Sequence, residues 1–253
     1  MGIENKVALI TGGASGFGEA TSILFAREKA KVVIVDIDGV KGEAVAKRIK
    51  ADGGDCISVE GDVSKTGDVR KIIDAAVERY QRLDILFNNA GIPMNSAEVE
   101  FLEESVWDEV FNVNLKSIFL FSKYAVPLMK KQGSGVILNT ASVSGIRPRP
   151  GQVPYAVSKG AVIVLTKALA LELAPYHIRV NSISPVAADT PMLRKLTAHI
   201  PDLEEAKKGL IASIPLGRLA DAKDVANAAL FLASDESSMI TGINLQVDGG
   251  RGI

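Results

Sequence analysis

The segment KVALITGGASGFGEATSILFAREKAKVVIVD, residues 6–36, determines the fold class. Residues 6–11 form a nearly continuous apolar run, as expected of a strand that is buried on both faces. Residues 20–30 have helical periodicity, and residues 31–36 form a second apolar run. A strand, a glycine-rich turn, a helix and a further strand make a βαβ unit, whose two strands lie parallel in one sheet.

The same alternation continues through the 253 residues of the chain. Five further strands are predicted at 56–63, 83–91, 135–142, 178–185 and 242–250. Helices are predicted at 40–53, 69–82, 104–131, 154–174, 200–212 and 221–233. No linker or repeat interrupts the pattern, so we expect a single α/β domain, residues 1–253, with helices on both faces of a parallel sheet. The least regular stretch, about 186–200, opens a segment of about 186–213 that we expect to form a lid over a substrate.

Composition excludes several classes of protein. The formal net charge is −1, so no electrostatic footprint for nucleic acid is present. The single cysteine, Cys56, has no internal disulfide partner, which fits a reducing compartment. No apolar run approaches the ~18 residues of a membrane span, and the first residues resemble neither a secretory signal nor a myristoylation site. His177 and His199 belong to no ligand cluster, so we expect no metal site. A cytoplasmic protein is predicted.

The turn TGGASGFG, residues 11–18, points to a dinucleotide. Its glycines have the spacing G-x-x-x-G-x-G, which differs from the common G-x-G-x-x-G fingerprint. Glycines permit a tight turn and let the backbone approach a pyrophosphate at a helix N-terminus. The turn residues expected to bind a cofactor are Gly12, Ser15, Gly16, Phe17 and Gly18.

Asp36 ends the second predicted strand. A carboxylate there can bond both ribose hydroxyls of an adenosine half and would repel the 2′-phosphate of NADP. Neither the adjacent Ile37, also expected at the cofactor, nor Ser15 supplies a positive charge to offset that repulsion. NAD is therefore predicted, with NADP less favoured, although a strand-end Asp also serves as a turn cap in many proteins.

Two more strand ends are expected to face the same ligand. Asp62 and Val63 end the third predicted strand, and NNAG, residues 88–91, ends the fourth. Doubly wound folds bind ligands at the carboxyl ends of their strands. Among these residues, the expected cofactor contacts are Asp62, Val63, Asn89, Ala90 and Gly91. The alternative for Asn88 and Asn89 is that each merely satisfies backbone groups of its loop.

The sequence YAVSK, residues 155–159, places Tyr155 and Lys159 on one face of a helix. A nearby ammonium favours the phenolate, and this would lower the phenol pKa from about 10 toward neutrality. The alternative is a half-buried tyrosine and a solvated lysine at a helix start. Ser142, which ends the preceding strand, is within possible reach of a substrate oxygen shared with Tyr155. Asn114 interrupts an apolar helical stretch, so it either has a polar role or is a satisfied buried amide.

Together these motifs resemble the short-chain dehydrogenase/reductase family, in order and over essentially the whole chain. The resemblance implies a Rossmann-type, doubly wound parallel sheet of about seven strands. It implies that Tyr155 is the general acid/base and that Lys159 lowers its pKa and bonds the nicotinamide ribose. Ser142 would orient the carbonyl, and Asn114 would hold a water in a proton relay. A homo-oligomer, often a tetramer, is also implied, with helices 104–131 and 154–174 at an interface.

One segment departs from the family pattern P-G-x-[VI]-x-T. In PVAADT, residues 185–190, Pro185 and Thr190 match, whereas Val186 replaces Gly and Ala188 replaces the β-branched residue. We expect Pro185, Ala188 and Thr190 to contact the cofactor, with Thr190 bonding its carboxamide. Val186 restricts the backbone relative to Gly and narrows the substrate side.

The loop 144–154 is expected to line the substrate site. Arg147 and Arg149 would meet an anionic substrate group there, unless they are solvated or oligomer contacts, which is the commoner case. Other possible pocket residues are Met94, Gln152, Met192 and Leu193.

The predicted function is NAD-dependent hydride transfer between nicotinamide and a secondary alcohol or ketone. The alternatives are a 3-oxoacyl-carrier-protein reductase, a sugar or polyol dehydrogenase, a nucleotide-sensing scaffold without catalysis, and a hydrolase with Ser142 as nucleophile. The hydrolase lacks a G-x-S-x-G elbow and a histidine partner.

Overall fold

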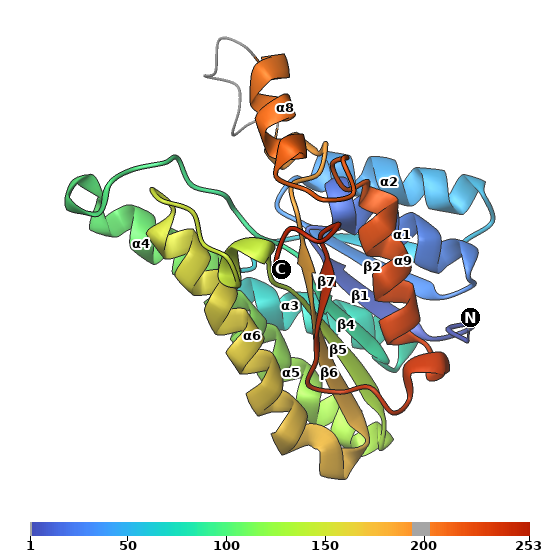
Figure 1. The fold of residues 1–253 in the computed structure, drawn as a ribbon. Helices are drawn as coiled ribbons and strands as arrows, with labels where there is room; N and C mark the ends of the chain where they lie inside the picture. Colours follow the sequence, from blue (N-terminus) through green and yellow to red (C-terminus); the bar gives the residue numbers. More distant parts are fainter. Residues whose placement is uncertain (1, 194–202) are drawn as a thin grey trace.

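A computed structural model describes residues 2–193 and 203–253. The described residues form one seven-stranded sheet in the order β3-β2-β1-β4-β5-β6-β7, with every pairing parallel (Figure 1). The strands are β1 (Val7–Thr11), β2 (Lys31–Asp36), β3 (Cys56–Glu60), β4 (Ile85–Asn88), β5 (Gly135–Thr140), β6 (Ile178–Pro185) and β7 (Asn244–Val247). The strand order reverses between β1 and β4, so the prediction of a doubly wound parallel sheet of about seven strands is confirmed.

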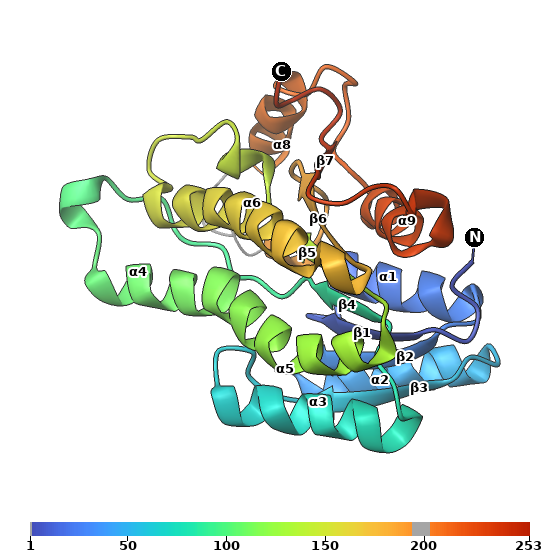
Figure 2. The ribbon, with the colours of Figure 1, turned by 90° about the horizontal axis from the view of Figure 1, so that it is seen from below.

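Helices cover both faces of this sheet, as Figure 2 shows from below. The helices of the described residues are α1 (Gly16–Arg27), α2 (Gly39–Ala51), α3 (Thr66–Tyr80), α4 (Glu104–Phe111), α5 (Ser117–Gln132), α6 (Val153–Leu173), α8 (Leu203–Ala212) and α9 (Ala222–Ala233). Helices α1, α2 and α9 share one core cluster, and α3, α5 and α6 share the cluster on the opposite face. No helix in the described part of the chain has the length and apolar character needed to cross a membrane.

The sequence of β1 explains why the core has two halves. All five of its residues are buried. Successive side chains of a strand point to opposite faces, so Ala8 and Ile10 join the cluster under α1, whereas Val7 and Leu9 join the cluster under α3 and α5. A strand with apolar residues at every position is what a sheet covered on both sides requires.

The predicted helix at 104–131 is wrong as a single regular helix. Helix α4 passes through a π-helical turn at Asn112–Lys116 before α5 begins. Such turns are rare and are frequently found at functional sites. Here the turn contains the buried Asn114, the polar residue that stood out in the apolar stretch.

Several predicted strands are also too long. The strand predicted at 83–91 covers only Ile85–Asn88, and the strand predicted at 56–63 ends at Glu60. The residues beyond these ends are loops at the carboxyl edge of the sheet. Ligand-binding residues belong there, because loop backbone is free to turn its polar groups toward a ligand.

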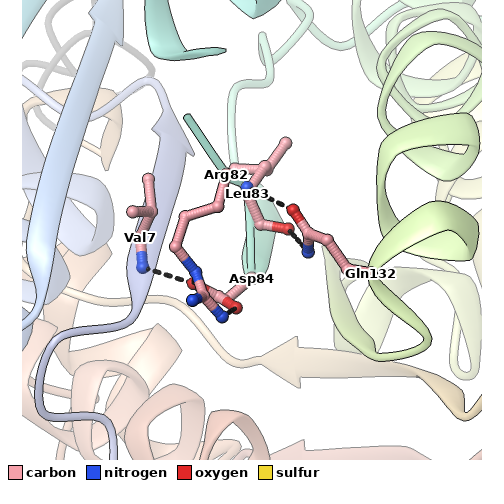
Figure 3. Close-up of polar contacts among 5 residues, drawn as sticks. All are labelled: Val7, Arg82, Leu83, Asp84 and Gln132. Carbon is pink, nitrogen blue, oxygen red and sulfur yellow. Dashed lines mark hydrogen bonds and ion pairs between the residues drawn. The ribbon is translucent and has the colours of Figure 1, made fainter. Parts of the chain in front are cut away.

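The amino edge of the sheet is fixed by a polar cluster at the start of β4 (Figure 3). The buried Asp84 carboxylate accepts hydrogen bonds from the Val7 amide at 2.8 Å and from the Arg82 guanidinium at 2.8 and 2.6 Å. The Gln132 side chain, at the end of α5, bonds both the amide and the carbonyl of Leu83. These contacts tie β1, β4 and α5 together at the edge opposite the cavity described next.

Candidate active site

A cavity of about 480 Å³ opens at the carboxyl edge of the sheet. Its walls come from the glycine turn after β1, the loop after β4, the end of β5, the first turns of α6, and the loop after β6. Residues that are far apart in the sequence therefore meet in one space. A cavity at the point where the strand order reverses is the usual ligand site of an open α/β sheet.

The glycine turn has the backbone that a phosphate group needs. Gly12 and Gly16 have φ of 61° and 53°, in the left-handed region that disfavours side chains. A Cβ on Gly12 would lie 3.0 Å from Ala90 Cα, and one on Gly18 would collide with the carbonyl oxygen of Gly12. Gly12, Ser15, Gly16 and Phe17 line the cavity at the N-terminus of α1. The turn thus fits a pyrophosphate held by backbone amides and the helix dipole.

Asp36 lies at the end of β2, and its carboxylate caps two turns. One oxygen accepts from the Ala14 amide and the other from the Asp38 amide, both at 3.1 Å. The turn-cap interpretation of Asp36 is therefore confirmed. A carboxylate has about four lone-pair sites, so both oxygens retain capacity for ribose hydroxyls.

A cation, Lys41, lies close enough to Asp36 for the two charges to interact. Lys41 forms an ion pair with Asp38 at 2.7 Å, and its pKa is raised chiefly by Asp38 and further by Asp36. Ile37 is 70% exposed beside them. Lys41 lies in the first turn of α2, and its place in the sequence does not show that its charge acts on Asp36.

The ends of β3 and β4 differ in their relation to the cavity. Asn89, Ala90 and Gly91 line the cavity, whereas Asp62 and Val63 lie outside its lining. Asp62 accepts from the amide and hydroxyl of Ser64 at 2.8 and 2.7 Å, and Val63 is buried in the core. Their predicted contact with a cofactor stays a prediction.

Asn89 connects three strands. Its amide nitrogen donates to the Thr11 carbonyl at 3.0 Å and the Gly12 carbonyl at 3.3 Å, and its oxygen accepts from Thr140. The Thr11 hydroxyl in turn accepts from the amides of Asn89 and Ala90. The structural interpretation of Asn89 thus holds, because the side chain satisfies the backbone of the glycine turn. Thr11 was missed from sequence, since a threonine at a strand end carries no distinctive signal.

Asn88 takes a different direction, into the core. Its amide nitrogen donates to Asn139 at 2.9 Å, and Asn139 donates to Thr166 of α6 at 3.0 Å. The register pairs Asn88 with Asn139 on neighbouring strands. This buried ladder joins β4, β5 and α6 directly below the cavity.

Lys159 is buried, with only 3% of the residue exposed. Its Nζ donates to the Thr140 carbonyl at 2.7 Å and lies 5.9 Å from the centroid of the Tyr155 ring. The solvated-lysine alternative is therefore wrong. Burial lowers the pKa of Lys159 from 10.5 to about 8, because a charged group loses hydration in the interior.

The expected lowering of the Tyr155 pKa is not found in the chain alone. Burial raises the pKa of the phenol, and a hydrogen bond with Ser142 partly offsets that rise. Desolvation is the largest cause of the shift, because burial disfavours the charged phenolate. The pair therefore favours an uncharged phenol.

A close backbone approach holds Ser142 next to this pair. Ser142 lies two residues beyond the end of β5, and its hydroxyl accepts a hydrogen bond from the Ser144 amide at 3.1 Å. A Cβ on Gly145 would lie 2.6 Å from the Gly160 nitrogen and from the Lys159 carbonyl carbon. Glycine at 145 thus lets the loop that follows Ser142 rest directly on α6. Gly145 was missed from sequence, since one glycine in a loop is common.

Asn114 is buried and fully bonded. Its oxygen accepts from the Ile92 amide at 2.8 Å, and its nitrogen donates to the Ile92 carbonyl at 3.0 Å. The satisfied-amide interpretation is confirmed for these contacts. A Cβ on Gly91 would lie 3.2 Å from Asn114 Oδ1 and 3.4 Å from Lys159 Nζ, so the structure brings Asn114 close to Lys159. The predicted relay water stays a prediction.

The loop after β6 accepts valine at position 186 without strain. Val186 is buried against Val143, Ile214 and neighbouring apolar side chains. Non-glycine residues with left-handed φ in the described chain are Asn5, Lys29, Gln81 and His177. Val186 is not among them, so the departure from the family's glycine needs no unusual backbone here, and its side chain lines the cavity.

Pro185, Ala188 and Thr190 also line the cavity. Ala188 pairs with Ala220 in an isolated parallel bridge. The Thr190 amide donates to the Ala188 carbonyl at 2.8 Å, and its methyl group faces Gly16, where an added Cβ would lie 3.4 Å away. The loop after β6 thus meets the glycine turn. The predicted lid falls partly on residues 194–202, which lie outside the described residues, as does His199.

The predicted substrate residues divide into two groups. Met94, Gln152, Met192, Leu193 and Arg149 line the cavity. Arg147 does not, because its guanidinium bonds the backbone carbonyls of Arg251 and Ile253 at 3.1 and 3.3 Å. Among the residues that the structure describes, no cluster of His, Cys, Asp and Glu could hold a metal ion.

Known proteins resemble this chain over its whole length. The family model described as enoyl-(acyl carrier protein) reductase matches residues 12–251. A 3-oxoacyl-[acyl-carrier-protein] reductase of Thermotoga maritima is 43% identical over 99% of each chain. A 4-formylbenzenesulfonate dehydrogenase of Comamonas testosteroni is 40% identical over 100% of each. The crystal structure of a Brucella melitensis 3-ketoacyl-(acyl-carrier-protein) reductase complexed with NADH superposes with a TM-score of 0.92, at 44% identity, over 99% of this chain and 100% of that one.

Proposed function

Because the chain belongs to the short-chain dehydrogenase/reductase family and is an oxidoreductase of alcohols and ketones, we propose that it uses NAD(H) and acts through Tyr155, Lys159, Ser142 and Asn114. The reaction converts a ketone, NADH and one proton into a secondary alcohol and NAD⁺, so atoms and electrons balance. The observation that carries the proposal is the buried Lys159 beside Tyr155 and Ser142, in a cavity that begins at the glycine turn.

The residues present fit a nicotinamide dinucleotide. The side-chain-free turn at Gly12 and Gly16 would hold the pyrophosphate, and Asp36 would hold the adenosine ribose. The remaining contacts would come from Asn89, Ala90, Gly91, Pro185, Ala188 and Thr190. When bound, the nicotinamide supplies or accepts the hydride.

Two carboxylates support NAD over NADP. Asp36 ends β2 and accepts a hydrogen bond from the amide of Asp38, the N-cap of α2, whose own carboxylate holds Lys41 in an ion pair. A 2′-phosphate would therefore meet net negative charge rather than a free cation. The Brucella relative was crystallised with NADH, which agrees with this preference.

The chain's own residues would move the proton. In ketone reduction, the Tyr155 hydroxyl gives its proton to the carbonyl oxygen as the carbonyl π electrons move onto that oxygen. The Ser142 hydroxyl donates a second hydrogen bond to the same oxygen and orients the substrate. The raised pKa of Tyr155 favours the protonated phenol, which is the form that reduction consumes.

Lys159 and Asn114 would support that proton transfer. Once Tyr155 has given up its proton, the Lys159 ammonium is the adjoining positive charge that stabilises the phenolate. Asn114 holds the loop after β4 through Ile92 and packs close to Lys159 through Gly91. We therefore expect Asn114 to act chiefly by positioning Lys159.

Other functions have less support. A hydrolase would need a histidine beside Ser142, and no histidine among the described residues lines the cavity. Reduction of 3-oxoacyl thioesters is the second candidate, favoured by the names of the Thermotoga and Brucella relatives. A homotetramer and a cytoplasmic location stay predictions. Exposed apolar side chains on α5 and α6 favour an interface there, namely Phe119, Val157, Val164 and Leu171.

The test compares wild type with Tyr155→Phe, and Tyr176→Phe serves as the matched control on an exposed ring. Ketone-dependent oxidation of NADH and NADPH is followed by absorbance over a panel of ketones. Loss of a general acid should lower kcat by at least about 100-fold, while NADH binding, measured by calorimetry, stays within about threefold. The proposal fails if Tyr155→Phe keeps wild-type turnover or if the protein binds no NADH.

A further inference from the structure

Three arginines lie near one another, and one of them, Arg149, lines the cavity. Arg149 reaches the cavity from the loop before α6 and is half-buried. Burial lowers the pKa of its guanidinium, and the neighbouring Arg251 and Arg147 lower it further. Arg251 comes from the segment that follows β7, and Arg147 bonds that segment's backbone. The fold thus gathers three positive charges from two separate parts of the chain.

No carboxylate in the described chain bonds any of these three arginines. The Arg149 guanidinium makes one weak hydrogen bond, to the Ser213 hydroxyl at 3.4 Å. Arg147 bonds backbone carbonyls only, and the buried Nε of Arg251 has no hydrogen-bond partner. Asp248, the acid nearest Arg251 in sequence, uses its two oxygens on the amides of Gly250 and Gly252.

Such a cluster is unfavourable without an anion. A guanidinium does not lose its proton in a protein, so burial and mutual repulsion are not relieved by deprotonation. A carboxylate or sulfonate would relieve both, because it accepts two parallel hydrogen bonds from an arginine.

The loop is held in place to present Arg149. The Ala97 amide, in the loop after β4, donates to the Gly151 carbonyl at 3.0 Å. Gly151 has φ of 76°, and a Cβ there would collide with the Ser96 hydroxyl. The two loops are therefore packed together two residues beyond Arg149.

Much of the cavity lining is apolar. Tyr155, Ser142 and Arg149 all line the same cavity, together with apolar side chains such as Met94, Val186 and Leu193. We propose that Arg149, assisted by the charges of Arg147 and Arg251, binds an anionic group of the substrate, so that the substrate is a ketone or secondary alcohol with a carboxylate or sulfonate on an apolar spacer. This inference rests on the proposed function only for the reaction at Tyr155 and Ser142, and not for anion binding at Arg149.

The test uses 4-acetylbenzoate, 4-acetylbenzenesulfonate and the neutral methyl 4-acetylbenzoate. The variant is Arg149→Met, which keeps a flexible unbranched stem and removes the charge, and Arg70→Met on the exposed face of α3 is the matched control. A hydrogen-bonded charge contributes about 1.5–3 kcal/mol. We therefore expect Arg149→Met to lower kcat/KM for the two anions by about 10- to 100-fold and to change the ester by less than about threefold.

A second measurement separates this inference from the proposed function. Calorimetric binding of 4-acetylbenzoate to the cofactor-free protein should be detectable in wild type and Arg70→Met, and at least about 10-fold weaker in Arg149→Met. If no ketone is reduced but this binding pattern holds, the proposed function fails and the anion site stands. Equal effects of Arg149→Met on the anions and the ester, or wild-type binding that does not distinguish acid from ester, would overturn the inference.

Discussion

The buried ammonium of Lys159 should make the stability of the protein depend on pH in a defined direction. Its pKa falls from 10.5 to about 8 on folding, which corresponds to about 3 kcal/mol at ~1.4 kcal/mol per pH unit. The group is 3% exposed, so solvent screening does not reduce this figure. Replacing Lys159 with Met removes the free-energy cost of burying the ammonium and also removes the hydrogen bond to the Thr140 carbonyl. The loss of the hydrogen bond does not vary with pH.

Because the folded-state pKa lies below the unfolded one, the unfolded chain binds more protons between pH 8 and pH 10.5. The cost of Lys159 is full below pH 8 and disappears as pH rises through this window. Wild type should therefore gain about 2 kcal/mol relative to Lys159→Met between pH 7 and pH 9.5. The measurement is urea unfolding followed by circular dichroism, at both pH values and at one protein concentration.

Lys47→Met, on the exposed side of α2, is the control, since that ammonium is in water in both states. Its difference from wild type should be the same at the two pH values. A difference between wild type and Lys159→Met that stays constant with pH, or that moves in favour of the variant as pH rises, would refute the assignment of a desolvated cation at this position.

Three other changes test separate parts of the structure. Asp36→Ala should lower the ratio of kcat/KM for NADH to that for NADPH by at least about 10-fold, because the charge that repels a 2′-phosphate is gone; an unchanged ratio removes Asp36 from cofactor selection. Gly145→Ala should abolish most activity, because the added Cβ would lie 2.6 Å from the α6 backbone. The control is Gly67→Ala, which should keep its activity because an added Cβ there has no atom within 4 Å. Equal activities of the two variants would contradict the close approach at Gly145. Asp84→Ala should destabilise the fold by about 2 kcal/mol in urea unfolding, because it leaves the Val7 amide unpaired; a loss no larger than that of the exposed Asp74→Ala would show that the cluster in Figure 3 does not anchor β4.

The fold could be predicted from the sequence because the patterns that indicate it lie within short segments of the chain. The apolar runs at β1 and β2 and the glycines between them fix a βαβ unit, and parallel pairing follows from the helix that connects the strands. The lengths of β3 and β4 did not follow, since a strand ends where its partner ends, and residues such as Val63 and Asn89 look as strand-like as the residues before them. The π turn was not predicted either, and the Asn114 side chain in that turn bonds Ile92, which is distant in the sequence.

The sequence predicted many of the residues that line the cavity, but it did not predict the direction of the Tyr155 pKa shift. The Tyr155–Lys159 spacing predicted proximity correctly, but the direction of the Tyr155 pKa depends on how much water the fold removes, which spacing alone does not contain. Arg147 and Arg149 are equivalent by sequence. In the structure, one bonds the backbone near Arg251 and the other enters the cavity, because the segment after β7 occupies the space beside Arg147.

The proposed reaction requires that the hydride come from C4 of NADH and that the proton come from Tyr155. NADH deuterated at the transferred position of C4 should give a product alcohol with one deuterium on its carbinol carbon, detected by mass spectrometry. Tyr155→Phe should form that product at least about 100-fold more slowly. Product without the label, or labelled product formed by Tyr155→Phe at the wild-type rate, would contradict the proposed chemistry.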